Sequence, residues 1–503
     1  METLDLLLNG LVAALSFQVL LATFLGVLLG LAVGVLPALG PAAAIAILLP
    51  IVFRFEPTTA MAGLAGLYYG TMYGGAVTSI LLGIPGESAS MMTTLDGYPM
   101  ARRGEAGRAL GMSVYASFIG GLIALVLFTA LATSFARYAV AFGPAEMTAL
   151  IVLALTFTTT LGGENMAKGF CSLALGLWIG MIGMDMVTGA PRFTFGSTNL
   201  LDGIDFSVVA IGVYGLGQFF ADMGKQEEGQ FTPKYTFRSL FPRLHDIIVC
   251  WKDLILGSVI GFLVGVLPGA GATAATIFSY AASKKLSKHP EKFGKGAIEG
   301  IASPEAANNA ASYANMIPLF ALGIPGSGTT AVMLGGLLML GLQPGPLLFT
   351  ERPDFIWPLI GTFYVGNVLL VVLTILLTPI LASIVYVPLK VLVPIIAGIV
   401  GFGVYSINYS IFDIWMALGF GVLGYIMTKL NYSVVPLMLG VVLGPLLEQG
   451  VRRALISSGG DPTIFVERPI ALALFALSSL VVLVPLGRKF LKRAQGRLAA
   501  GAG

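Results

Sequence analysis

Two short sequence blocks each occur twice in this chain, and both place glycine and proline inside apolar segments. The pentapeptide Leu-Gly-Ile-Pro-Gly spans Leu82–Gly86 and again Leu322–Gly326. An earlier block, Leu25–Pro37, shares 8 of 13 residues with Leu256–Pro268. The pentapeptides lie 240 residues apart and the earlier blocks 231, so the repeats keep their order and nearly their spacing. A duplicated pair of interrupted hydrophobic segments indicates a secondary transporter with a binding site near the middle of the bilayer.

The composition places the chain in a membrane. Of its 503 residues 56% are hydrophobic and only 11% are charged, and the mean hydropathy is +0.90. A soluble domain has roughly 25% charged residues, and apolar runs long enough for a membrane helix recur along the whole chain. We therefore predict an all-α polytopic membrane protein, with a first helix that is retained rather than cleaved as a signal peptide. Two cysteines and two histidines offer neither a disulfide framework nor a transition-metal site.

The basic residues predict the topology, because loops rich in lysine and arginine stay in the cytoplasm. A second-half loop carries Lys284, Lys285, Lys288, Lys292 and Lys295, whereas the matching first-half loop is short and neutral. Later in each repeat the charge imbalance reverses. The first half carries Arg102, Arg103 and Arg108, whereas the matching second-half segment, with Glu351, Arg352 and Asp354, is mildly acidic. Because equivalent loops carry opposite charge bias, we predict two inverted-topology repeats.

We divide the chain into four parts on these grounds. Residues 1–222 form the N-terminal half, 223–252 a cytoplasmic connection, 253–487 the C-terminal half and 488–503 a basic cytoplasmic tail. The first repeat has a re-entrant hairpin at about 20–55 and a broken helix at about 58–100, and the second has them at about 254–283 and 296–345. About twelve transmembrane helices complete the prediction, with both termini in the cytoplasm.

The breaks are the predicted binding sites. Helix N-termini carry partial positive charge and unpaired N–H groups that suit an anion, while unwound carbonyls suit a cation such as Na⁺. The predicted substrate ligands are Pro85, Gly86, Glu87, Ser88, Asn308, Asn309, Pro325, Gly326, Ser327, Gly328, Thr329 and Thr330. The predicted Na⁺ ligands are Pro37, Gly40, Gly83, Gly271, Thr273 and Gly323. Beyond Na⁺ (or H⁺) as the coupling ion, we expect no cofactor.

Polar residues also precede each break at the same offset. Tyr68, Tyr69 and Tyr73 align with Asn308, Asn309 and Tyr313. Asparagine in a membrane helix also serves as a hydrogen-bonding link between helices, so a purely structural role stays open. Glu87 and Glu305 are intramembrane acids and therefore functional candidates, although Glu305, next to the lysine-rich loop, also fits a position at the membrane surface.

The repeated blocks resemble a known family. GVLPALGP, YGTMYGGAVTSILLGIPGESAS, GLQPGP and the long block from GVLPGAGATAATIFSYAASKK to ALGIPGSGTTAVMLGGLL are similar to the large membrane subunit of the tripartite tricarboxylate transporters, over nearly the whole chain. The resemblance implies a bacterial inner-membrane, secondary-active importer of carboxylates. It also implies an elevator-type fold, Na⁺ coupling, and two partners, a small four-helix membrane subunit and a periplasmic solute-binding protein. Nucleic acid is not an expected partner.

Other functions remain as alternatives. A cation/proton antiporter of similar architecture would use Glu87 as its carrier acid and would bind no organic substrate. Another alternative is a channel or a non-transporting membrane scaffold, and the duplicated polar breaks argue against the scaffold. An intramembrane protease would need a catalytic constellation that two loop histidines do not supply, so we do not expect an enzyme. The stretch Phe293–Gly296 (FGKG) lacks the spacing of a phosphate-binding loop.

Overall fold

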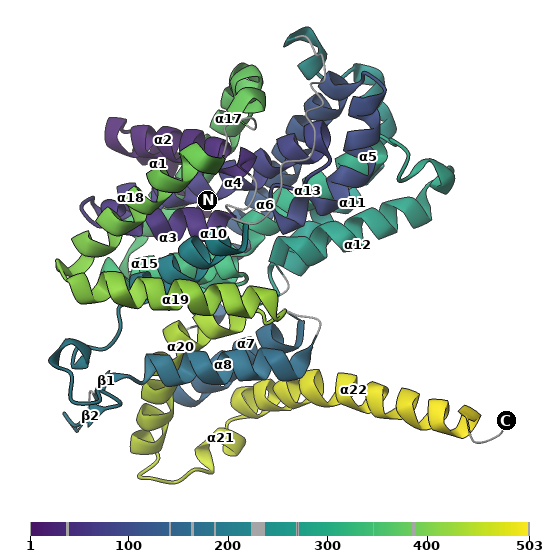
Figure 1. Ribbon diagram of the computed structural model, residues 1–503. Helices are drawn as coiled ribbons and strands as arrows, with labels where there is room; N and C mark the ends of the chain where they lie inside the picture. The colour runs from purple at the N-terminus through teal and green to yellow at the C-terminus, as the bar shows by residue number, and fades with distance from the viewer. Residues whose placement is uncertain are drawn as a thin grey trace. The chain divides into compact units, whose positions relative to one another are not determined.

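The chain folds into α-helices grouped in two compact units (Figure 1). The computed structural model describes residues 2–36, 40–139, 142–161, 165–185, 188–222, 237–267, 269, 271–345, 347–384 and 389–500. The first unit comprises Met1–Ala139 and Asp205–Val434, and the second comprises Val140–Ile204 and Val435–Gly503. The predicted ligand Pro37 and residues 223–236 of the predicted connection lie outside the described residues.

The first unit contains both sequence repeats. Its helices are α1 (Glu2–Ala14), α2 (Phe17–Val35), α3 (Pro41–Val52), α4 (Pro57–Leu82), the 3₁₀ turn η1 (Ser88–Ser90), α5 (Met91–Arg102), α6 (Ala106–Ala139), α9 (Phe206–Ala210), the π-helix η3 (Ile211–Leu216), α10 (Gly217–Asp222), η4 (Phe237–Leu240), α11 (Leu244–Gly265), α12 (Gly271–Leu286), η5 (Pro290–Lys292), α13 (Glu299–Ala314), α14 (Met316–Leu322), α15 (Gly328–Met339), α16 (Leu348–Glu351), α17 (Pro353–Ile384), α18 (Leu389–Asn408) and α19 (Ile411–Lys429). The series α2–α5 therefore matches α11–α15, with helix ends at both pentapeptides.

The two repeats pack in the same way, residue for residue. Glycines four residues apart on α2 lie against the backbone of α4, and their counterparts on α11 lie against α13. A Cβ built on Gly30 would lie 2.4 Å from the Leu67 carbonyl oxygen, and one on Gly261 would lie 2.4 Å from that of Ala307. Small residues allow this close approach of membrane helices. Residues that are equivalent in sequence at offsets of 231 and 240 thus also make equivalent contacts.

Alanine at Gly261 is expected to destabilise the protein by about 1–3 kcal/mol, because the new methyl group meets helix backbone that cannot rotate away. The matched control is Gly419→Ala on α19, where a Cβ would have no neighbour within 4 Å. Thermal unfolding of both variants in detergent measures the difference. A Gly261→Ala protein that melts with the wild type would contradict the close approach.

The remaining helices of the first unit surround the repeats. α17 packs against α1, α2, α4 and α6, and α6 packs against α13. α5, α12 and α13, which come from different repeats, lie side by side (Figure 1). Every residue of α13 from Gly300 to Ala314 is buried. Polar groups of α13 therefore lie inside protein, where each requires a partner.

The second unit is smaller. It contains α7 (Pro144–Leu161), α8 (Met166–Gly180), the antiparallel strands β1 (Gly183–Met184) and β2 (Pro191–Arg192), η2 (Thr198–Leu200), α20 (Val434–Ser457), α21 (Ile464–Glu467) and α22 (Pro469–Ala500). Ion pairs join the hairpin to α20, with Arg452 2.6 Å from Asp185 and Arg192 2.9 Å from Glu448. The predicted basic tail belongs to α22.

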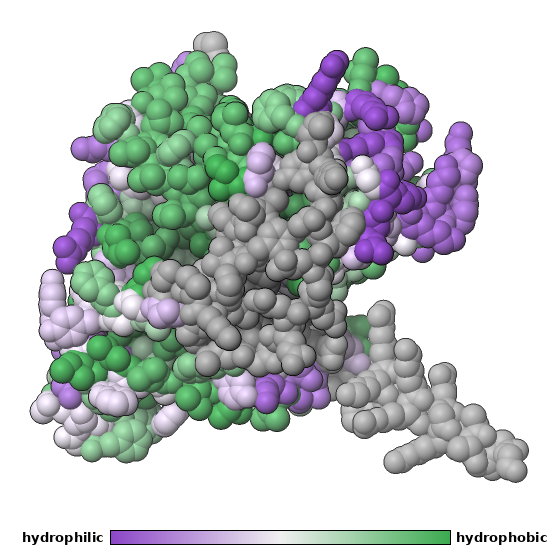
Figure 2. Space-filling view, turned by 45° about the horizontal axis from the view of Figure 1, so that its top comes forward, coloured by the Kyte–Doolittle hydropathy of each residue, from purple (hydrophilic) through white to green (hydrophobic). Residues whose placement is uncertain are grey.

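Apolar surface remains exposed on the long helices. In the described residues, six helical segments are long and apolar enough to cross a membrane, namely Phe17–Val35, Ala106–Leu131, Phe237–Gly265, Pro353–Leu381, Ile411–Lys429 and Val434–Ser457, and shorter apolar helices accompany them. Large side chains on their surfaces stay open, such as Phe17 at 79% and Leu263 at 62% exposed. Figure 2 shows a broad hydrophobic face, with the largest group of hydrophilic residues at the upper right and smaller groups along the left edge and below. The protein is an all-α, multi-pass membrane protein, as predicted.

Candidate functional site

Each pentapeptide ends a helix by the same backbone geometry. Gly83 follows α4 with φ +73°, and Gly323 follows α14 with φ +69°. This left-handed conformation favours glycine and closes helix C-termini. Proline two residues later supplies no N–H to continue the helix. The two predicted breaks are therefore built alike. At the second break, the amides of Gly323 and Ile324 donate to the carbonyls of Leu319 and Pro318, which closes the end of α14.

The helix that follows each break begins with an equivalent cap. The Glu87 amide donates to Ser90 Oγ at 3.4 Å, and the Ser327 amide donates to Thr330 Oγ1 at 2.9 Å. Thr330 N in turn donates to Ser327 Oγ at 3.3 Å. Ser327 and Thr330 were predicted as substrate ligands, and the structure shows that their hydroxyls also serve this cap. Gly328 and the buried Thr329 begin α15.

The tips between the paired helices lie against the breaks. The Gly269 amide donates to the Gly326 carbonyl at 3.0 Å, and a Cβ on Gly271 would lie 3.9 Å from Ser327 Cβ. Ser88 Oγ lies 2.8 Å from Thr273 Oγ1, so the first break also contacts the start of α12. Gly40 precedes α3 in open space. The structure therefore brings Gly271 and Thr273 to the breaks, whereas among the described residues no atom lies within 4 Å of a Cβ built on Gly40.

Polar contacts connect the two repeats at the centre of the unit. Asn308 Nδ2 donates to Glu87 Oε1 at 3.4 Å, and Asn315 Nδ2 donates to the Tyr68 hydroxyl at 3.4 Å. Ser327 also lies near the Tyr68 hydroxyl. The side chains of Tyr68, Asn308 and Asn315 are buried. A carboxylate and a group of amide and hydroxyl donors thus meet between the breaks.

The oxygen atoms of these asparagines are left without partners. Among the described residues, Asn308 Oδ1, Asn309 Oδ1 and Asn315 Oδ1 are buried and accept no hydrogen bond. Buried polar atoms are nearly always paired, so such orphans indicate a ligand or water that completes them. Asn309, a predicted ligand, differs from Asn308, because its amide donates to the Glu305 carbonyl of its own helix at 3.3 Å.

The two breaks differ in exposure. Around the first, Ile84, Pro85 and Ser88 are exposed and Glu87 is half-buried, although Gly86 is buried. Around the second, Gly323, Pro325 and Gly326 are all buried. The first break is therefore open at the surface of the described chain, whereas the second is enclosed.

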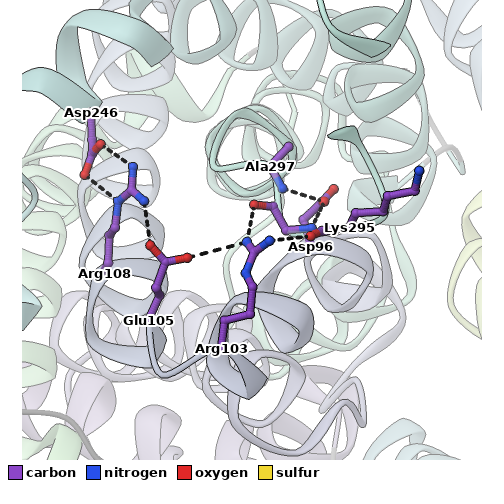
Figure 3. A network of polar contacts seen from close by, with 8 residues as sticks. Asp96, Arg103, Glu105, Arg108, Asp246, Lys295 and Ala297 are labelled. Carbon is purple, nitrogen blue, oxygen red and sulfur yellow. Dashed lines mark hydrogen bonds and ion pairs between the residues drawn. The ribbon is translucent and has the colours of Figure 1, made fainter. Parts of the chain in front are cut away.

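A polar network holds the middle and the C-terminal end of α5 against the second repeat (Figure 3). The buried Asp96 accepts from the amides of Gly294, Gly296 and Ala297 at 2.8–2.9 Å and from the Tyr280 hydroxyl at 2.8 Å. Backbone N–H groups arranged in this way form an anion site. The FGKG segment thus does bind an anion, but that anion is the protein's own carboxylate.

Two arginines extend the network. Arg103 donates to the carbonyls of Lys295 and Gly296 at 2.9 and 2.8 Å. Arg108 at the start of α6 holds Asp246 on α11 with two bonds of 2.6 and 2.9 Å. Asp96 and Asp246 are not among the predicted site residues, because each has its partners in a distant part of the sequence.

Replacing Asp96 with alanine is expected to destabilise the protein by about 3 kcal/mol or more, because each buried donor left unpaired costs about 1–3 kcal/mol. The freed loop should also become sensitive to trypsin at Lys292 and Lys295. Asp461→Ala, which removes an exposed carboxylate bonded to the Thr463 amide, is the control. Equal melting temperatures and equal cleavage rates in the two variants would contradict this role.

Comparison with known proteins places the chain in a family. A family model for the tripartite tricarboxylate transporter TctA family matches residues 20–439. An Agrobacterium vitis protein described as an uncharacterized 52.8 kDa protein in the TAR-I ttuC' 3' region is 41% identical over 463 residues, covering 92% of each chain. A second, from the TAR-II ttuC' 3' region of the same organism, is 43% identical over 226 residues, covering 45% of this chain and 93% of its own length. No solved structure matches. The chain belongs to the tripartite tricarboxylate transporter TctA family.

Proposed function

We propose that this chain is the large transmembrane subunit of a binding-protein-dependent transporter that imports di- or tricarboxylates together with Na⁺ or H⁺. Membership of the TctA family supports a role for this chain as a component of a tripartite tricarboxylate transporter. The observation that carries the substrate site is the contact between the repeats, in which the Asn308 amide meets Glu87. The contact between Asn315 and Tyr68 adds a second pair of polar groups beside it.

The donors at the centre suit a carboxylate substrate. A carboxylate accepts hydrogen bonds from N–H and O–H groups. Such donors are present on the amides of Asn308 and Asn315 and on the hydroxyls of Tyr68 and Ser88. In our proposal the first break, from Pro85 to Ser88, receives the substrate because it is exposed. The N-terminus of α15 at Ser327–Thr330 adds partial positive charge.

Glu87 explains why an ion is needed. A substrate carboxylate placed beside the Glu87 carboxylate would be repelled in a site of low dielectric constant. A cation nearby, or a proton on Glu87, removes that repulsion, and each ligand then favours binding of the other. We propose that the carbonyls of Gly83 and Gly323, with Gly271 and Thr273, hold the ion.

The transport movement involves the repeats as one body. We propose that α2–α5 and α11–α15 move against the remaining helices in an elevator mechanism, with the repeats in inverted orientation. The partners are a small TctB-like subunit of about four helices and a periplasmic TctC-like solute-binding protein. The complex lies in the bacterial inner membrane, with both termini of this chain in the cytoplasm.

Uptake into proteoliposomes tests the proposal. The vesicles contain this chain and its small subunit, with or without the binding protein, and an imposed Na⁺ or proton gradient. Radiolabelled citrate and a panel of dicarboxylates serve as substrates. Gradient-driven uptake that requires the binding protein supports the proposal, whereas cation flux without carboxylate movement would establish the antiporter instead.

A further inference from the structure

A second buried carboxyl group, that of Glu305 on α13, lies outside the candidate site. The residue is 0% exposed, so its carboxyl group is enclosed by protein rather than open to solvent. Thr93 Oγ1 on α5 donates to Glu305 Oε1, and Ser117 Oγ on α6 donates to Oε2 at 3.2 Å. Ser113 is a third hydroxyl neighbour. Three helices thus meet around one acid.

The surroundings of Glu305 contain no compensating cation. In the part of the chain that the structure describes, its side-chain partners are hydroxyls and it forms no ion pair. A buried charge without a counter-ion is costly, and proteins reduce that cost by protonation. Each hydroxyl both donates and accepts. The same shell therefore serves a carboxylate, by donating to it, and a carboxylic acid, by accepting from it.

Two hydroxyls near Glu305, that of Ser113 and that of Tyr73, are not used in hydrogen bonds among the described residues. Both hydroxyls are buried. Tyr73 on α4 is close enough to interact electrostatically with Glu305. Buried hydroxyls in native proteins are normally satisfied. Their free hydrogen-bonding capacity therefore lies beside the carboxyl group of Glu305.

The position of Glu305 along α13 connects two polar regions. Gly300, where α13 packs against Asp96, precedes it by roughly 7.5 Å of helix, and Asn308, which bonds Glu87, follows it by roughly 4.5 Å. Glu87 and Glu305 interact electrostatically. Glu305 therefore lies between the loop network of Figure 3 and the candidate site.

The other titratable groups around α13 are engaged elsewhere or lie toward its first turn. Asp96 on α5 accepts from Tyr280 on α12, and Arg108 on α6 pairs with Asp246 on α11. Cys250 and Asp253 on α11 face Glu299. Tyr73 and Glu87 are therefore the titratable groups that interact with Glu305 itself.

We propose that Glu305 binds and releases a proton in each transport cycle. The inference rests on the proposed transport function and adds a proton site to it. Gain of the proton gives the carboxyl group one O–H donor, while its other oxygen remains an acceptor. The hydroxyl beside the protonated oxygen, that of Thr93 or of Ser117, then reverses its hydrogen bond, which alters how α5 or α6 is held against α13.

Infrared difference spectroscopy of the purified chain tests the proton site without transport. Between mildly acidic and mildly alkaline buffer, the wild type should lose the carbonyl band of a buried carboxylic acid. In a Glu87→Gln background, which removes the other carboxyl group proposed to hold a proton, Glu305→Gln should lack this change, and Glu291→Gln, which alters an exposed loop residue 64% open to solvent, should keep it. A wild type without the band, or a Glu305→Gln protein in that background that retains it, would overturn the proposal.

The transport assay supplies the second measurement. Uptake by the complete complex should change by about tenfold per pH unit where proton occupancy is limiting, and Glu305→Gln should flatten this profile. Uptake by Glu305→Gln that follows the wild-type pH profile would overturn the proposal even if the rate is lower. Absence of carboxylate uptake by the wild-type complex would instead refute the proposed function, and the spectroscopic result would then decide the proton site alone.

Discussion

A disulfide between cysteines introduced at Thr23 and Gly366 is expected to abolish gradient-driven carboxylate uptake, and reduction is expected to restore it. Thr23 belongs to α2, which we assign to the moving body, and Gly366 belongs to α17, which we assign to the static helices. A Cβ built on Gly366 would lie 3.4 Å from Thr23 Cγ2, within the reach of a disulfide. A covalent bond across this interface prevents the two bodies from sliding.

The control is a disulfide inside the moving body. Asp253 and Ser283 hydrogen-bond to each other between α11 and α12, so cysteines at these positions should also join. Native Cys250 is replaced by alanine and Cys171 by serine beforehand. An elevator tolerates this second disulfide, because both ends move together. Full uptake by protein cross-linked between Thr23 and Gly366 would rule out the proposed movement.

Replacing Asn308 with leucine is expected to lower the uptake efficiency by about tenfold to a hundredfold. The change keeps a similar volume but removes the donor to Glu87, and hydrogen bonds to charged groups contribute about 1.5–3 kcal/mol, with each 1.4 kcal/mol worth a factor of ten. Initial uptake rates over a range of substrate and ion concentrations measure the loss. The fall should appear in both the substrate and the ion dependence, because Glu87 links them.

Asn309→Leu is the matched comparison. Asn309 is equally buried, but its amide bonds to the Glu305 carbonyl within α13 and not to Glu87. We expect a smaller loss, provided that detergent-solubilised protein elutes and melts like the wild type. Equal losses for the two asparagines would show that burial of polar groups in α13, rather than contact with Glu87, limits uptake.

The sequence predicted the helical membrane architecture because its main signals are local. Gly83 and Gly323 end helices for reasons contained in a few residues, and the repeat offsets carry over to the packing of Gly30 and Gly261. The all-α polytopic class is confirmed. The number of crossings, the inverted orientation and the binding roles of the breaks stay predictions.

The cross-repeat contacts could not be read from the sequence. Tyr68 and Asn315 lie 247 positions apart and meet only when the repeats pack together. The offset aligns Tyr68 with Asn308, so sequence comparison pairs residues that are equivalent rather than residues that touch. Asp96 was overlooked for the same reason, since its partners lie about 200 positions later. Pairing between repeats depends on packing angles that local periodicity does not contain.

The unequal exposure of the two breaks gives the repeats different freedom to change. Substitutions near Pro85 and Ser88 alter side chains at an open surface and cost little folding free energy. Substitutions near Pro325 and Gly326 disturb a packed interior, where added volume is destabilising. Under the proposed function, a change of substrate preference is therefore most easily acquired through the first half of the chain, while the second half is held to one shape by its own stability.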